Sequence, residues 1–130
     1  PHGDPLLDQK SVALTDLAER RWVHFTRAHG LAEVLDFCCG TAGFAPRVAL
    51  RTSQVTAAPL FAAAGIGPTL VPSHIVPAAL THLARPAGPR PIRTVCAFTR
   101  GEWSALTSSF LESLRDFPWG PKPRGALDLG

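Results

Sequence analysis

The sequence predicts an α/β fold for a chain of 130 residues. Short apolar runs rich in β-branched and aromatic residues alternate with stretches in which apolar residues recur at helical spacing, and this alternation is typical of α/β proteins. Hydrophobic residues make up 45% of the chain and charged residues 18%, a composition that excludes a chain disordered overall. A chain of this length buries roughly two-thirds of its unfolded surface, so we expect a hydrophobic core without disulfides.

The first elements follow an irregular opening that extends through Lys10. Residues 12–14 are expected to be extended, and residues 15–18 to form a single capped turn. Residues 22–25, Trp-Val-His-Phe, are bulky and partly β-branched, which favours a strand. Residues 26–30 are polar and predict a turn after that strand.

A helix is predicted over residues 31–42, because five apolar residues there share one helical face. Those residues are Leu31, Val34, Leu35, Cys38 and Ala42. Gly43 is placed to end the helix. Cys38 lies on the apolar face and is expected to be buried, whereas Cys39 points elsewhere and is expected to be exposed.

A second strand and a second helix are predicted next. Residues 47–50 form the strand, which follows a proline. Thr52 and Ser53 are candidate caps for a helix that runs through residues 61–64 and ends at Gly65.

Two prolines complicate this region. Pro59 would remove a hydrogen bond from a helix capped at Ser53, so the helix either kinks or starts near Thr56, and the sequence leaves both open. Residues 66–71 form a short apolar strand, but Pro68 cannot donate to a ladder and favours an edge or irregular position.

The remaining elements are short. Residues 72–75 predict a turn around His74 and Ile75, residues 85–91 have the composition of a linker, and residues 92–99 predict a strand. Ser104 caps a final helix, and residues from 118 onward, rich in proline and glycine, predict a disordered tail. The final helix has one apolar face, formed by Leu106, Phe110 and Leu114.

Charge and motifs exclude several function classes. The net charge of +3 arises from scattered residues and is too weak to indicate a nucleic-acid surface. No apolar run approaches the roughly 18 to 20 residues that span a bilayer, and the first residues show no signal pattern. The five histidines have no metal-ligand spacing, and no catalytic or nucleotide-binding motif is present. We therefore expect no enzyme, no metal, no cofactor and no membrane contact.

The cysteines and the missing methionine bear on the origin of the chain. Cys38, Cys39 and Cys96 form neither an even disulfide framework nor a C-x-x-C pair, which favours a reducing cytosol. A thiol-based redox regulator is the least favoured of the alternatives. The chain contains no methionine, so we expect a truncated piece, a processed product or a fragment of a longer protein.

Two polar segments are candidate binding positions. Residues 26–30 and 52–54 each follow a predicted strand and precede a predicted helix. In a parallel sheet both lie at the carboxyl edge, where helix N-termini favour anions, and Arg27 would add a contact to a carboxylate or phosphate. Ordinary helix caps with a solvated arginine are the simpler alternative, because caps use the same residue types.

Four segments, in order along the chain, carry a resemblance to a known family. Residues 62–72, Ala-Ala-Ala-Gly-Ile-Gly-Pro-Thr-Leu-Val-Pro, resemble the "AAG-L-G-hydrophobic-LLP" segment of LysR-type transcriptional regulators. Residues 4–18 look like the His-Pro-Leu entry into the second half of the family's effector domain. Residues 42–48 are similar to its turn into a strand, and residues 104–114 to its closing helix.

The resemblance implies a periplasmic-binding-protein-like (type 2) effector domain over residues 1–117, followed by a flexible tail at 118–130. The chain would be the second lobe plus the strand and helix that return to the first lobe. The first lobe and the DNA-binding helix-turn-helix would then lie outside this chain, in a cytoplasmic regulator that acts as a homo-oligomer, a dimer or tetramer. Its partners would be a small-molecule effector, plausibly an organic anion, and operator DNA contacted only through the missing domain.

The resemblance also places an effector site. By position, the cleft would be lined by Thr26 and Arg27, by Thr52 and Ser53, and by Pro72. The chain departs from the family at His2, which is displaced from the usual His-Pro pair, and at the two prolines that interrupt a helix and a strand. A solute-binding protein of the same bilobal architecture, serving transport, is the alternative function.

Overall fold

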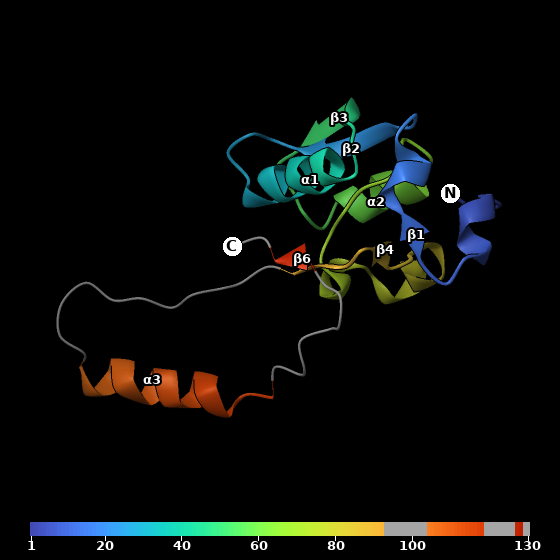
Figure 1. Ribbon diagram of the computed structural model, residues 1–130. Coiled ribbons are helices and arrows are strands. Elements are labelled where there is room, and N and C mark those ends of the chain that lie inside the picture. The colour runs from blue at the N-terminus through green and yellow to red at the C-terminus, as the bar shows by residue number, and fades with distance from the viewer. Residues whose placement is uncertain (93–103, 119–126, 129–130) are drawn as a thin grey trace.

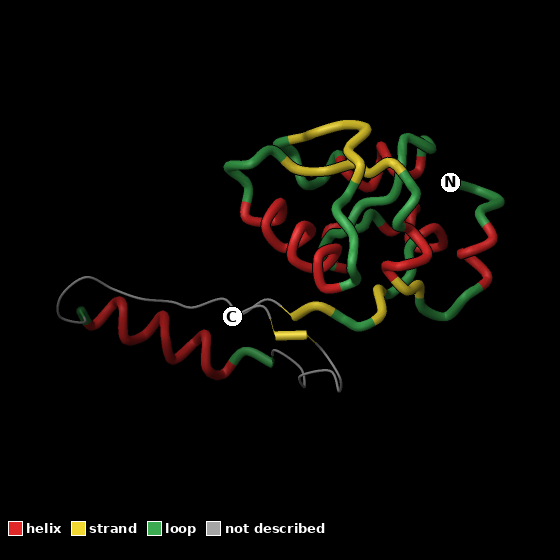
Figure 2. The backbone as a smooth tube through the Cα atoms, turned by 45° about the horizontal axis from the view of Figure 1, so that its top comes forward, coloured by secondary structure: helices red, strands yellow, loops and turns green. Residues whose placement is uncertain are grey.

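The computed structural model describes residues 1–92, 104–118 and 127–128. Residues 1–92 form a body in which short helices surround strands, and the helix α3 (Ala105–Asp116) lies apart from it (Figures 1 and 2). The described strands form three parallel pairs: β1 (Val12–Ala13) with β4 (Ala87–Gly88), β2 (Arg21–Phe25) with β3 (Arg47–Thr52), and β5 (Pro91–Ile92) with β6 (Leu127–Asp128). The predicted α/β class is confirmed.

The pair β2 and β3 with the helix α1 (Gly30–Thr41) is the central unit of the body (Figure 1). Residues 22–25 of β2 are all buried, as expected for a bulky apolar strand. Two parallel strands need a crossover connection, and α1 provides it. The predicted strands at 22–25 and 47–50 are confirmed, with β3 extending two residues further.

The helix α1 begins and ends close to the predicted residues. His29 caps it, because its Nδ1 accepts a hydrogen bond from the backbone N–H of Leu31 at 3.1 Å. Gly43, with φ +87°, follows its last turn, where a side chain would be strained. Of the predicted apolar face, Leu31, Leu35 and Cys38 are buried, and Val34 and Ala42 are half-buried.

The expected exposure of Cys39 is wrong, since its exposed fraction is 0%. The 3-10 helix η2 (Leu14–Leu17) contacts α1 and covers a second stripe of it. Cys39 therefore lies in a core cluster with Leu14 and Trp22, beside Cys38. A helix covered on two sides buries more than one row of residues, which the single apolar stripe did not show.

The helix α2 (Ala58–Ala63) decides between the two alternatives for Pro59, a kinked helix or a later helix start. The helix begins within two residues of Thr56, and Pro59 occupies its first turn, where no intrahelical N–H bond is lost, so it does not kink. Capping by Thr52 or Ser53 is wrong: Thr52 ends β3 and its Oγ1 accepts from the N–H of Gln54 at 3.0 Å. The helix ends before Gly65, as predicted.

Residues 66–71 do not form a strand, so that prediction is wrong and the irregular alternative holds. The carbonyl of Pro68 accepts a single hydrogen bond from Val23 N at 2.9 Å. Gly67 passes so close to β2 that a Cβ built on it would lie 1.8 Å from the carbonyl oxygen of Arg21. The segment thus lies against β2 without continuing its ladder, because Pro68 has no N–H to donate.

Among the remaining short elements, some predictions are confirmed and others are wrong. β1 confirms the extended segment, and η2 confirms a turn, but it has no side-chain cap because Ala13 precedes it. The 3-10 helix η3 (Ser73–Ile75) confirms the turn after Pro72. Two 3-10 helices were not predicted: η1 (Pro5–Asp8) in the opening thought to be irregular, and η4 (Ala78–Leu83).

One prediction near the C-terminus also needs correction. The presumed linker at 85–91 contains β4 and the first residue of β5, because its backbone pairs with distant segments despite its prolines. Of the strand predicted at 92–99, only Ile92 lies within the described residues. In the predicted tail, residues 127–128 form β6, and most of the others lie outside the described residues.

The closing helix is confirmed as α3. Ser104 Oγ accepts from the N–H of Thr107 at 3.2 Å, which is the predicted cap. Leu106 and Phe110 of its apolar face are 83% and 59% exposed. None of the described helices is long and apolar enough to cross a membrane.

Candidate functional site

Four of the five predicted site residues lie together at the carboxyl edge of β2 and β3. Thr26 and Arg27 directly follow β2, Thr52 is the last residue of β3, and Ser53 comes next. The backbone N–H of Thr26 donates to the carbonyl of Thr52 at 3.1 Å, one position beyond the pair of Phe25 with Thr52. Arg27 and Ser53 are exposed. We call these four residues the carboxyl edge.

The fifth predicted residue, Pro72, lies apart from the carboxyl edge. It precedes η3, at the end of the segment that lies against β2. It lines an apolar hollow, described below, to which none of the other four residues contributes. The structure therefore does not bring Pro72 together with the predicted polar contacts.

The turn behind the carboxyl edge is held by backbone bonds and by His29. His29 N donates to the carbonyl of Thr26 at 2.9 Å, and the ring of His29 stacks on Phe25 with centroids 5.3 Å apart. Since α1 begins at Gly30, the positive end of its dipole lies directly behind Thr26 and Arg27. This arrangement favours an anion at the edge.

A hydrogen-bonded group that the sequence analysis missed lies beneath the edge. His24 is fully buried in β2, and its Nε2 is 3.0 Å from the carboxylate of Asp36 on α1. Its Nδ1 lies 3.0 Å from an Nη of Arg51 and 2.9 Å from the N–H of Phe25. The carbonyl oxygen of Phe25 also lies 2.9 Å from Nδ1. The carboxylate of Asp36 only accepts, so Nε2 donates its proton to Asp36.

This group connects the ends of the two strands. The same guanidinium of Arg51 donates to the carbonyl of Phe25 at 2.9 Å, directly before Thr26, while Arg51 itself directly precedes Thr52. His24, Asp36 and Arg51 come from three elements and have no motif spacing. No sequence signal identifies such a set.

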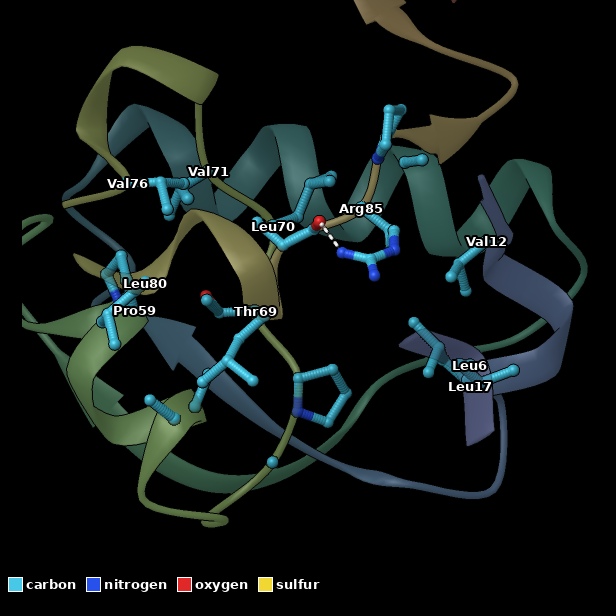
Figure 3. A pocket seen from close by; sticks show the side chains of 18 of the residues that line it. Leu6, Val12, Leu17, Pro59, Thr69, Leu70, Val71, Val76, Leu80 and Arg85 are labelled. Carbon is cyan, nitrogen blue, oxygen red and sulfur yellow. Dashed lines mark hydrogen bonds between the residues drawn. The ribbon is translucent and has the colours of Figure 1, made fainter. Parts of the chain in front are cut away.

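An apolar hollow of about 1130 Å³ is lined by residues from three stretches of chain, 1–34, 59–76 and 80–91. Figure 3 shows side chains converging on it, with Pro59, Val71, Val76 and Leu80 on one side and Leu6, Val12 and Leu17 on the other. Asp4 lies at this hollow and is hydrogen-bonded to Arg20, which lowers the pKa of the Asp4 carboxyl. Within the described residues, no group of His, Cys, Asp and Glu is arranged to hold a metal ion.

The two adjacent thiols are poor nucleophiles in this environment. Burial raises the pKa of Cys38, and raises that of Cys39 to about 12, with further contributions from Cys38 and from the carboxylate of Asp36. Thiolates, not thiols, react with oxidants. The geometry around these two residues does not favour a redox sensor.

A parallel pair of strands with polar residues at its carboxyl edge is the arrangement in which α/β domains bind small ligands. Comparison with known proteins agrees, since residues 1–118 match the family described as the LysR substrate binding domain. The chain belongs to this family, which confirms the resemblance carried by its four segments. The family is regulatory rather than enzymatic, and it has the periplasmic-binding-protein-like type 2 fold.

A curated relative agrees with the family. The chain is 38% identical over 72 residues to the "Transcriptional dual regulator GltC" of Bacillus subtilis (strain 168). The match covers 55% of this chain and 24% of that protein. The chain therefore corresponds to about a quarter of the length of this relative.

Proposed function

We propose that the chain is the effector-sensing part of a LysR-type transcriptional regulator and that a small organic anion binds at its carboxyl edge. The observation that carries this proposal is the hydrogen bond from Thr26 N to Thr52 O, which brings two separate polar segments to one place. Family membership supports the sensing role. The relative GltC, a transcriptional regulator by name, supports the regulatory context.

The chemistry of the edge favours an anion. Arg27 is exposed and has no acidic partner among the described residues. Its guanidinium is available for a paired hydrogen bond to a carboxylate, while the hydroxyls of Thr26 and Ser53 add neutral donors. The start of α1 contributes the positive end of a helix dipole.

Sensing requires a second surface. We propose that this chain supplies the second lobe and that the effector binds between it and a first lobe contributed by the rest of the protein. Binding then shifts the relative orientation of the lobes in a cytoplasmic homo-oligomer. This shift changes how DNA-binding domains, also outside the chain, contact an operator.

The test is a titration of the full-length protein with a panel of small anions. Malonate, succinate, citrate and inorganic phosphate are added while the Tm is followed, and the anion with the largest effect is titrated by calorimetry. Arg27→Ala should weaken its binding by about 10-fold to 100-fold, the range for charge-assisted hydrogen bonds. Ser53→Ala should weaken it by a smaller factor, because a neutral bond is lost.

Arg47→Ala is the matched control. Arg47 begins β3, at the opposite end of the strand pair from Arg27, and contacts Glu19. This variant removes the same charge from the protein without touching the carboxyl edge. Unchanged affinity in both Arg27→Ala and Ser53→Ala would overturn the site, as would equal losses in Arg27→Ala and Arg47→Ala.

A further inference from the structure

Two buried polar atoms without a hydrogen-bond partner lie at one small cavity. They are the indole Nε1 of Trp22 and the hydroxyl Oγ1 of Thr69, and neither has a partner within the described part of the chain. Trp22 is only 1% exposed. Both residues line a cavity of about 60 Å³. A buried donor destabilises the fold unless something in the cavity accepts its hydrogen bond.

The small cavity adjoins the apolar hollow. The two share much of their lining, namely Val12, Leu17, Thr69, Leu70, Arg85 and Ala87. Figure 3 shows Thr69 and Leu70 between the two groups of apolar side chains that converge on the hollow. A molecule that fills the hollow can thus reach the unpartnered atoms with one end.

The charges around the hollow favour a negatively charged ligand, and one of its arginines, Arg85, also lines the small cavity. Among the described residues, the only acidic one that lines the hollow is Asp4, which is hydrogen-bonded to Arg20. Arg21, Arg85 and Arg90 also line the hollow and have no carboxylate partner among the described residues. The donors of Arg85 bind backbone carbonyls only, those of Leu7, Gln9, His82 and Ala84.

We propose that the hollow binds an amphipathic carboxylate, with its apolar body among the aliphatic side chains and its carboxylate in the small cavity. An indole N–H can only donate, so the group that meets Trp22 must accept, and a carboxylate also accepts from the hydroxyl of Thr69. A water needs about 10–15 Å³ of such a cavity, so 60 Å³ has room for a carboxylate. This site is separate from the carboxyl edge, whose four residues do not line it.

The first experiment titrates the full chain with saturated carboxylates of increasing length, from butyrate to dodecanoate, by calorimetry. Each added methylene should tighten binding by about fourfold until the hollow is filled, the factor expected for burying a CH₂ group. The alcohol of the same length should bind at least about tenfold more weakly, since it lacks the charge. Absence of binding across the series would overturn the proposal.

Two variants test the polar end, of which Thr69→Val is near-isosteric and Trp22→Phe also replaces the indole by a smaller ring. Trp22→Phe removes the indole N–H and Thr69→Val removes the hydroxyl, and each should weaken decanoate binding by about tenfold. Thr56→Val is the control, because Thr56 is exposed and lines neither cavity. Arg27→Ala should leave decanoate binding unchanged, which separates this site from the proposed effector site.

Thr69→Val also tests whether a ligand or bound water is the hydrogen-bond partner of the two buried atoms. A hydroxyl without a partner destabilises the free protein, so its removal should raise the Tm in the absence of carboxylate. A lower Tm together with unchanged decanoate affinity would mean that waters satisfy both atoms, and would overturn the proposal. Since Thr69→Val conserves shape, the test stands even where Trp22→Phe does not fold.

Discussion

At the scale of single residues, the thiol of Cys39 makes stability depend on alkaline pH. Its pKa is raised from the ordinary value of 9.0 to about 12, chiefly by burial. A group whose pKa is higher in the folded state stabilises the fold fully below the unfolded pKa and ceases to do so as the pH rises through the folded pKa. The relevant window is therefore between about pH 9 and pH 12.

We expect the free energy of unfolding to fall across that window by up to about 1.4 kcal/mol per pH unit from this thiol. Arginines and lysines titrate in or above the same range, so the measurement is a comparison with Cys39→Ala. Urea unfolding at several pH values should show a shallower fall for the variant. Parallel curves for the two proteins would contradict the raised pKa.

His24 holds the strand ends through two neighbours on other elements. His24→Phe replaces the imidazole by a somewhat larger apolar ring and leaves Asp36 and Arg51 without the imidazole contacts they make at 3.0 Å. The loss in unfolding free energy should be about 1–3 kcal/mol, because the buried N–H of Phe25 also loses its acceptor, His24 Nδ1. Urea unfolding measures it.

His82→Phe is the control for His24→Phe. The side chain of His82 is exposed, and its ring contacts only the ring of His2 among the described aromatic groups. The control should change the unfolding free energy by less than about 0.5 kcal/mol. Similar losses in the two variants would show that the contacts of His24 do not stabilise the strands.

These residues show which parts of the site are visible in the sequence. The position of Thr26 and Arg27 at the sheet edge could be predicted because they follow a clear strand, and the same holds for the position of Ser53 after β3. His24 could not, since its importance depends on Asp36 and Arg51, which come from other elements. Short-range patterns carry no information on such contacts between elements.

At the scale of elements, Gly67 allows residues 66–71 to lie against β2. A Cβ at Gly67 would lie 1.8 Å from the carbonyl oxygen of Arg21, so Gly67→Ala must push the segment away. The bond from Val23 N to Pro68 O then lengthens or breaks. We expect a loss of about 1–3 kcal/mol in unfolding free energy, the range for overpacking, measured by urea unfolding.

Gly40→Ala provides a matched substitution with the opposite expected sign. Gly40 lies inside α1, and a Cβ built there meets nothing within 4 Å. Alanine should stabilise the helix by about 0.5–1 kcal/mol. Equal effects of the two glycine substitutions on the unfolding free energy would show that the close approach to β2 does not require a glycine at position 67.

The elements also differ in how well their sequence reveals them. β2, α1 and β3 could be predicted because a bulky run, a helical apolar stripe and a glycine end agree with one another. Residues 66–71 are as apolar as a strand, but Pro68 prevents a ladder, and only the chain geometry decides the outcome. β4 could not be predicted, because its two residues lie in a proline-rich segment and their partner β1 is far away in the sequence.

At the scale of the whole molecule, α3 presents an apolar face that the described body does not cover. Leu106 and Phe110 are among the most exposed large hydrophobic residues, and α3 lies apart from residues 1–92 (Figure 1). The resemblance implied that this helix packs on a first lobe. That packing stays a prediction, and the exposed face agrees with it.

The bonds of Arg85 also set the order in which the chain folds. Its guanidinium holds the carbonyl of Gln9, 76 residues earlier, while β1 pairs with β4 over a similar distance. The unit from β2 to β3 pairs residues that are much closer in the sequence, such as Arg21 with Arg47, so we expect it to form before the N-terminal segment, which needs a longer loop to close. During synthesis, Asp4 at the start of η1 can bind Arg20 early, whereas the carbonyls of Leu7 and Gln9 and the strand β1 gain their partners only after residues 85–88 have left the ribosome.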